Sequence, residues 1–299
     1  MKLPKELQLA KLVAEAPEGD DWLHEVKFDG YRIVAIKEGA DVQLVSRRFK
    51  DWTAEFPAVA AAVGKLKIPN AILDGEVAIL MPDGRTSFQG LQSRAGALVY
   101  FVFDRIDLGD QPLEQRKRAL AELVGTKQDG TIRYSDHVIG HGRKFFAAAC
   151  EKGLEGIISK RRDSLYSGGR GGAWLKTKCI LRQEFAIGGY TDPEGSRNHI
   201  GALLVGYHEG GHFKYAGKVG TGFTHKLLVE LKGLLDPLAR ETCPFTPPLR
   251  GKSMHWVEPK LVCEIAFTEW TNDGRLRHPS FQGLRKDKLA KDVVRERPA

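Results

Sequence analysis

Cysteine is scarce in this chain: four occur in 299 residues, and no two form a Cys-x-x-Cys pair. A zinc ribbon needs such paired ligands, so none is predicted. The pattern is typical of a cytosolic protein, in which thiols stay reduced. We therefore expect reduced and mostly buried side chains at Cys150, Cys179, Cys243 and Cys263.

Long apolar stretches are also missing. No apolar signal core follows the charges at the N-terminus, and no apolar run is long enough to span a bilayer. The chain has no internal repeat, and its only low-complexity patch is a basic, Gly-rich stretch at residues 167–172. We expect a cytoplasmic protein with no membrane partner.

The chain does have the length for two domains and a mild excess of positive charge. A chain of 299 residues can bury two separate cores, and 42% hydrophobic and 28% charged residues are ordinary for a globular protein. Lysine and arginine exceed the acids by 46 − 38 = 8. This excess favours an anionic partner such as nucleic acid, although solubility explains it almost as well.

The most informative stretch is residues 24–32, which predicts a strand, a tight turn containing Gly30, and a second strand. This geometry would hold Lys27 at the mouth of a pocket, beside Arg32. A lysine becomes a nucleophile when burial or a neighbouring cation lowers its pKa. For the Lys-x-Asp-Gly pattern alone, a solvated lysine in a surface hairpin is the better interpretation.

Periodicity and end signals predict the other elements. Thr53 is a plausible N-cap, and Gly125 and Gly153 are plausible stops. The helices are expected at residues 53–66, 113–124, 143–152 and 224–235. Strands are expected at residues 42–46, 71–80, 98–104, 155–162, 174–178, 185–190, 201–207, 213–216 and 261–267. Short strands and Gly turns after about residue 182 suggest a small β-barrel of the OB type.

Charged residues on the predicted strands allow two interpretations each. Asp74 and Glu76 are either solvent-facing hairpin charges or inward ligands for a ribose or a metal, because buried carboxylates need partners. Lys176 and Lys178 alternate along a strand and face one side, where they are either solvated or bind an anion. From periodicity alone, Phe103 is better interpreted as a core aromatic.

In their order along the chain, these segments resemble the motifs of the covalent nucleotidyltransferases, which include ATP-dependent DNA ligases, RNA ligases and mRNA capping enzymes. Seven motifs match in the family's order, at residues 27–32, 46–47, 74–76, 101–104, 155–158, 174–178 and 285–288. The chain looks most like the ligase part of bacterial ligase D, the non-homologous end-joining enzyme, at residues 22–32, 153–160 and 278–285.

The resemblance implies an α+β fold. Residues 1–182 would form the nucleotidyltransferase (ATP-grasp-like ligase adenylation) domain with antiparallel sheets and flanking helices, and residues 183–299 a small OB-fold β-barrel. The chain carries no counterpart of the polymerase and phosphoesterase modules of full ligase D, nor of the large N-terminal DNA-binding domain of eukaryotic replicative ligases. End processing is therefore not predicted.

The activity that the resemblance implies is ATP-dependent DNA ligation in three transfers. Lys27 attacks the α-phosphate of ATP to give lysyl-AMP, AMP moves to the 5′-phosphate of a break, and the 3′-hydroxyl then displaces AMP. The implied cofactors are ATP and Mg²⁺, with Mn²⁺ as an alternative. The implied partners are duplex DNA with nicks or ends and a Ku-type end-binding protein, and we expect a nucleoid-associated monomer.

The resemblance also implies a role for each motif residue. The catalytic residues would be Lys27, Asp29, Arg32, Lys176 and Lys178. The nucleotide would contact these lysines and Arg32, together with Glu25 at the adenine edge (partly by backbone), Arg47, Glu76 at the ribose and Phe103 stacked on adenine. Arg285 and Lys288 would orient pyrophosphate on domain closure, unless they belong to a basic C-terminal tail. The metal ligands would be Asp74, Glu76 and Glu155. The DNA backbone contacts would be Arg47, Arg48, Lys160, Arg161, Arg162 and Arg170.

Two alternatives stay open. One is an RNA ligase or a GTP-dependent capping-type nucleotidyltransferase, against which the motif at residues 174–178 and the ligase D-like segments argue. The other is a catalytically inactive DNA-end-binding module, which is disfavoured because the chain retains Lys27, Glu76, Glu155, Lys176 and Lys178.

Overall fold

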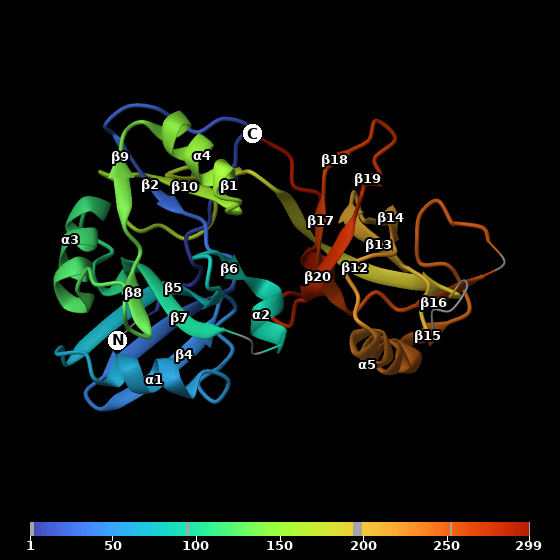
Figure 1. The fold of residues 1–299 in the computed structure, drawn as a ribbon, viewed down its shortest axis with the longest axis horizontal. Helices are drawn as coiled ribbons and strands as arrows, with labels where there is room; N and C mark the ends of the chain where they lie inside the picture. The colour runs from blue at the N-terminus through green and yellow to red at the C-terminus, as the bar shows by residue number, and fades with distance from the viewer. Residues whose placement is uncertain (1–2, 94–95, 194–198, 252, 299) are drawn as a thin grey trace. The chain divides into compact units, whose positions relative to one another are not determined.

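The computed structural model describes residues 3–93, 96–193, 199–251 and 253–298. The chain forms two compact units, Met1–Cys179 with Arg297–Ala299, and Ile180–Glu296 (Figure 1). The units divide just before strand β12 (Leu181–Thr191), whereas a division after residue 182 would cut this strand. Within the described residues, no helix is long and apolar enough to cross a membrane.

The larger sheet of the first unit has the strand order β4-β3-β5-β7-β8, with β6 beside β5. Its strands are β3 (Tyr31–Glu38), β4 (Asp41–Ser46), β5 (Asn70–Leu80), β6 (Thr86–Ser87), β7 (Ala97–Arg105) and β8 (Ile132–Tyr134). Alternate residues of β3 enter different cores, because Ile33 packs in one cluster and Val34 in another. Burial on both faces explains why the run after Arg32 is continuously apolar rather than alternating.

The second sheet of this unit has the order β1-β11-β10-β2-β9. Its strands are β1 (Lys11–Leu12), β2 (Trp22–Val26), β9 (His137–Ile139), β10 (Gly156–Arg161) and β11 (Trp174–Lys178). The chain passes from β2 to β3, and so from one sheet to the other, through residues 27–30. Gly30 is required there because a Cβ atom would lie 2.2 Å from the carbonyl oxygen of Val77.

The second unit is built on β12, which pairs with β13, β16 and β17. Its remaining elements are β13 (Leu203–Glu209), β14 (His212–Val219), α5 (His225–Leu235), β15 (Ala239–Arg240), β16 (Met254–Val257), β17 (Val262–Phe267), β18 (Glu269–Trp270), β19 (Leu276–Arg277) and β20 (Ser280–Leu284). This small antiparallel domain with one long helix is the OB-type domain that was predicted. The pairing found among the described strands runs from β14 to β15 without closing into a barrel.

The helices test the end signals directly. Helix α3 (Leu113–Val124) ends before Gly125 as predicted, and the positive φ of 78° at this position favours glycine. The helix predicted at residues 224–235 is found as α5, and Thr224, which was not predicted as a cap, caps it by accepting a hydrogen bond from the Leu227 amide. Helix α1 (Pro57–Gly64) is shorter than predicted, because the Thr53 hydroxyl accepts a bond from Leu44 instead of capping a helix.

Four short helical elements were not predicted, whereas α4 (Gly142–Glu151) lies within one residue of its expected bounds. The unpredicted elements are α2 (Phe88–Ser93) and the 3₁₀ turns η1 (Ile106–Leu108), η2 (Asp236–Leu238) and η3 (Ala290–Asp292).

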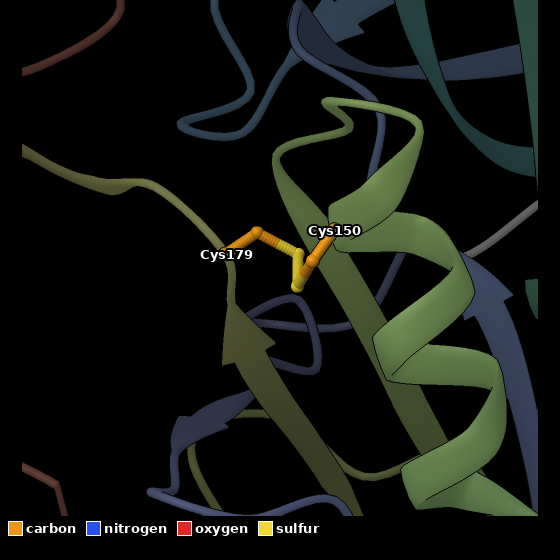
Figure 2. The surroundings of a disulfide bond; sticks show 2 residues. All are labelled: Cys150 and Cys179. Atoms are coloured by element: carbon orange, nitrogen blue, oxygen red, sulfur yellow. A yellow bond between two sulfur atoms is a disulfide. The ribbon is translucent and has the colours of Figure 1, made fainter.

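The expectation of four reduced thiols is wrong for one pair. Cys150 and Cys179 form a disulfide that joins the last turn of α4 to the chain just after β11, as Figure 2 shows. Cys243 and Cys263 are free. The two bonded residues are separated by 29 positions and meet only because α4 packs against β10, the neighbour of β11. Local sequence carries no signal of this contact.

Reducing this disulfide should lower the free energy of unfolding of the first unit by about 3 kcal/mol, because the bond closes a loop in the unfolded chain. Urea denaturation with and without dithiothreitol measures the change. Cys150→Ser should show the same loss and no further response to dithiothreitol, whereas Cys243→Ser should behave as wild type. Identical midpoints with and without dithiothreitol would contradict this expectation.

Candidate active site

Lys27 and Glu155 meet at the ends of neighbouring strands. Lys27 follows β2, and its amide donates to the carbonyl oxygen of Gly156 at the start of β10. Its Nζ lies 2.5 Å from Glu155 Oε1, and the two side chains are 23% and 5% exposed. A Cβ on Gly156 would lie 2.1 Å from the Thr177 carbonyl oxygen, so the glycine lets β10 and β11 approach. The fold thus joins the first and fifth motifs.

The charge state of Lys27 differs from the expected one. Burial by itself lowers the pKa of Lys27, but the ion pair with Glu155, with further attraction from Glu76 and Asp29, outweighs it and raises the pKa. Lys27 is therefore an ammonium at neutral pH, and the expectation of a lowered pKa is wrong for this state. Glu155 Oε1 is the acceptor placed to take its proton.

Arg32 and Asp74 form a two-pronged ion pair. Arg32 lies directly opposite Glu76 in the β3–β5 register, so it shares a face with Asp74 two positions along. Its Nε and Nη2 donate to Asp74 at 2.9 and 2.6 Å, and Asp74 is fully buried. Tyr166 donates to the same carboxylate at 3.0 Å. These groups bond both oxygens of Asp74, so Asp74 holds Arg32 in this structure, and the metal role of Asp74 stays a prediction.

Three other carboxylates surround Lys27. Glu155, Glu76 and Asp29 each raise the pKa of Lys27, which places several oxygen donors around one cation. Asp29 also accepts a hydrogen bond from the Phe88 amide at 3.1 Å. Among the described residues, no three or more His, Cys, Asp or Glu side chains are grouped so that they could hold a metal ion.

Lys176 and Lys178 lie on β11, where the predicted alternation is found. Both are half-buried, and Thr177 between them is buried. Lys178 pairs with Gly156 and Lys176 with Ile158, so both lysines are carried by the strand next to the one that begins after Glu155.

The Glu25 carboxylate is 2% exposed and fully engaged. Lys117 and Lys160 approach its two oxygens at 2.8 and 2.9 Å, and Ser135 donates to it at 3.1 Å. Burial raises the pKa of Glu25, but the two lysines outweigh this effect and lower it, so the group stays ionised. Only its backbone remains for the predicted adenine contact.

Phe103 is half-buried and lies edge-on to Trp174, with ring centroids 5.9 Å apart. The Lys160 Nζ and the Arg32 Cζ lie 4.4 and 5.4 Å from the Phe103 ring centroid. The Phe103 ring therefore makes cation–π contacts and does not only pack in the core. Its stacking on adenine stays a prediction.

The predicted DNA contact of Lys160 is wrong for this structure, because Lys160 is 1% exposed and donates a hydrogen bond to Glu25. Alternation along β10 places Lys160 and Arg161 on opposite faces, a signal that the basic cluster concealed. The other predicted contacts differ in their surroundings. Arg161 pairs with Asp163, and Arg162 pairs with Glu114. Arg47 is half-buried, and Arg48 and Arg170 are exposed.

Lys160→Ala should destabilise the fold by about 1–3 kcal/mol, because it removes a buried donor from Glu25 while Lys117 still balances the charge. Arg170→Ala should leave stability unchanged and weaken DNA binding with a reduced salt dependence. Urea denaturation and salt-dependent DNA titration measure the two effects. A stable Lys160→Ala variant with weakened DNA binding would restore the original prediction.

Arg285 and Lys288 are ordered in the second unit. Arg285 bonds Asp287 at 2.9 and 2.8 Å and Glu264 at 2.9 Å. Lys288 pairs with Glu184 at 2.9 Å. These contacts do not fit the alternative of a solvated basic tail. The role of both residues toward pyrophosphate stays a prediction.

Sequence reasoning missed two residues that contact this site. Gln8 accepts a hydrogen bond from Arg32 Nη1 at its backbone carbonyl, at 2.7 Å. Tyr166 bonds Asp74 from the segment before the Gly-rich loop. The first 20 residues carry no motif, so nothing local marks Gln8. The only sequence feature that could have marked Tyr166 as a site residue is its position just before the Gly-rich loop.

Two family models match the chain. The model described as "ATP dependent DNA ligase domain" matches residues 4–178, and "ATP dependent DNA ligase C terminal region" matches residues 196–288.

The chain is also similar to curated and solved proteins. It is 41% identical over 308 residues to the multifunctional non-homologous end joining protein LigD of Pseudomonas aeruginosa, covering 98% of this chain and 36% of that protein. It is 38% identical to the LigD of Mycobacterium bovis, covering 93% and 38%. A mycobacterial DNA ligase D complexed with ATP and MES matches with a TM-score of 0.69 and 34% identity, covering 96% of this chain and 98% of that one. The chain spans a little over a third of these curated relatives.

Proposed function

The chain belongs to the ATP-dependent DNA ligases, and we propose that it seals 5′-phosphate/3′-hydroxyl breaks in duplex DNA through a lysyl-AMP and a DNA-adenylate. The observation that carries the proposal is the pair of the half-buried Lys27 and the buried Glu155 at 2.5 Å, beside the strand of Lys176 and Lys178. A lysine in this setting has a defined proton acceptor and neighbouring cations for a polyphosphate.

ATP is the nucleotide of this family. Glu155 takes the proton of Lys27, whose free amine then attacks the α-phosphorus of ATP. The N–P bond forms as the bond to pyrophosphate breaks. Lys176 and Lys178 neutralise charge on the α-phosphate, and Arg32 presents forked donors to the ribose or a phosphate. We expect Arg285 and Lys288 to orient the pyrophosphate once the second domain closes on the nucleotide.

Glu155 and Glu76 are the residues that would hold Mg²⁺, or Mn²⁺ in its place. The fit is one of donor chemistry, since Mg²⁺ prefers carboxylate oxygens and completes its shell with water and substrate phosphates. Several carboxylates around Lys27 supply such donors without a preformed cage. The ion would lower the pKa of Lys27 and neutralise phosphate charge.

The two later transfers use DNA. The 5′-phosphate of the break attacks lysyl-AMP and releases Lys27, and the 3′-hydroxyl then attacks the adenylated phosphate while AMP leaves. Arg47 would meet the 5′-phosphate. The exposed Arg48 and Arg170 would contact backbone phosphates, which position the duplex without reading its sequence.

Sealing of a labelled 5′-phosphate nick with ATP and Mg²⁺, followed on a denaturing gel, tests this proposal. A joined strand is the expected product. Accumulation of adenylated DNA alone would mean that the last transfer fails. Sealing of RNA only, or use of GTP in place of ATP, would favour the RNA ligase or capping alternative. Duplex binding without covalent AMP would favour the inactive end-binding module.

We further propose that the protein acts in end joining, at the nucleoid in the cytoplasm, with a Ku-type end-binding partner. Support comes from the LigD relatives, which are described as multifunctional non-homologous end joining proteins. Joining of linear duplexes with and without such a partner tests this role. Stimulation of end joining but not of nick sealing is the expected result.

A further inference from the structure

The Tyr166 hydroxyl makes two hydrogen bonds next to Arg32. It donates to Asp74 Oδ2 at 3.0 Å and accepts from the Gln8 amide at 3.1 Å. Arg32 Nη2 donates to the same Oδ2 at 2.6 Å, and Arg32 Nη1 donates to the Gln8 carbonyl at 2.7 Å. The hydrogen bonds therefore form a closed network of Tyr166, Asp74, Arg32 and Gln8.

This hydrogen-bond network joins three separate parts of the first unit. Asp74 and Arg32 belong to β5 and β3, Gln8 to the N-terminal segment, and Tyr166 to the stretch before the Gly-rich loop. The N-terminal segment is tied to that loop as well, because the Leu9 amide donates to Gly169 and the Gly169 amide donates to Leu7. Gln8 adds a side-chain bond from the Ser167 amide.

The Tyr166 ring is held independently of its hydroxyl. It lies edge-on to Trp174, with centroids 6.1 Å apart and an interplanar angle of 89°. The guanidinium carbon of Arg116 lies 5.9 Å from the Tyr166 ring centroid. Removing the hydroxyl alone should therefore leave the ring in place and isolate the effect of its two hydrogen bonds.

The hydrogen-bond network orients the Arg32 guanidinium. Three of its five N–H groups are committed to Asp74 and Gln8, which sets the plane of the fork and leaves the remaining N–H groups pointing in fixed directions. Asp74 alone could hold the charge of Arg32. The orientation of the carboxylate, however, depends on what else bonds its oxygens, and Tyr166 bonds the oxygen shared with Nη2.

We propose that Tyr166 and Gln8 are positioning residues of the ligation reaction, which hold Arg32 in the orientation that contacts the nucleotide. This proposal rests on the proposed function, since it assigns Arg32 to ATP. Tyr166 acts through its hydroxyl and Gln8 through its backbone, so Tyr166 is the residue that substitution can test. A supporting hydrogen bond of this kind changes rate more than stability, because a small displacement of a contacting group slows a transfer strongly.

The test compares Tyr166→Phe with Tyr134→Phe, which loses a hydroxyl bonded to His137 in the same unit. For Tyr166→Phe we expect lysyl-AMP formation to slow about 10- to 100-fold, with a melting temperature close to that of Tyr134→Phe. Tyr134→Phe should keep the wild-type rate. Equal rates in the two variants, or a rate loss matched by unfolding, would overturn the proposal.

A double-substitution cycle separates positioning from a general defect. In an Arg32→Lys background the fork is absent, so adding Tyr166→Phe should slow lysyl-AMP formation much less than it does alone. If the two substitutions together slow lysyl-AMP formation by the product of their separate factors, Tyr166 acts independently of Arg32 and the proposal is overturned. Noncovalent ATP binding is measured for the same variants. A wild type that binds ATP but forms no covalent AMP would refute the proposed function, while weaker binding in Tyr166→Phe alone would still support the positioning role.

Discussion

Lys27→Ala should abolish covalent attachment of AMP to the protein. Alanine has no nucleophile, and the Lys27 amine lies 2.5 Å from the buried Glu155 carboxylate. Incubation with labelled ATP and Mg²⁺, followed by denaturing electrophoresis, measures the attachment. The matched control is Lys50→Ala, which removes an exposed lysine of the same unit and should keep the wild-type level.

The same variant separates the three transfers. Lys27 forms no bond in the final attack of the 3′-hydroxyl, so Lys27→Ala should still seal a nick that already carries AMP on its 5′-phosphate. Its fold and duplex affinity should also be retained. Covalent AMP at the wild-type level in Lys27→Ala would assign the nucleophile to another residue. Loss of sealing on the pre-adenylated nick, with the fold intact, would give Lys27 a second role.

Glu155→Gln should slow lysyl-AMP formation by about 10²- to 10⁴-fold. The amide keeps the shape of the side chain but cannot take the Lys27 proton or offer a carboxylate to a cation. Single-turnover measurement with labelled ATP gives the rate. Sealing of a pre-adenylated nick should fall less, because that step needs no proton from Lys27.

Glu151→Gln is the matched control for this prediction. Glu151 is an exposed glutamate at the end of α4, four positions before Glu155 in the chain, and its replacement should leave the rate unchanged. Glu155→Gln keeps the shape of the side chain but loses the charge that pairs with Lys27, so its melting temperature should be lower than that of Glu151→Gln, and the rates are compared at a temperature at which both variants are folded. Wild-type adenylation by Glu155→Gln would remove Glu155 from the proton transfer and from the proposed metal site.

Local patterns predicted much of the fold because the relevant interactions are local. Helix α3 ends just before Gly125, as its end signal indicates, and the helical pattern at residues 224–235 became α5. The strand, turn and strand predicted around residues 27–30 became β2 and β3, and alternation placed Lys176 and Lys178 on one face of β11. The prediction failed at Thr53, whose hydroxyl found a partner on β4 that no local pattern indicates.

The sequence by itself determined the family and most of the helices and strands that carry the motifs, and it predicts the nucleophile, because residue type and spacing are properties of short segments. Only the tertiary structure decided the partner of each buried charge. Lys160, which was predicted to contact DNA, pairs with Glu25, a residue 135 positions away in the sequence. Tyr166 bonds Asp74, which is 92 positions away. The Cys150–Cys179 bond likewise depends on the packing of α4. A buried ionic or polar group is stable only beside a complementary one, and which groups become neighbours depends on the pairing of strands far apart in the chain.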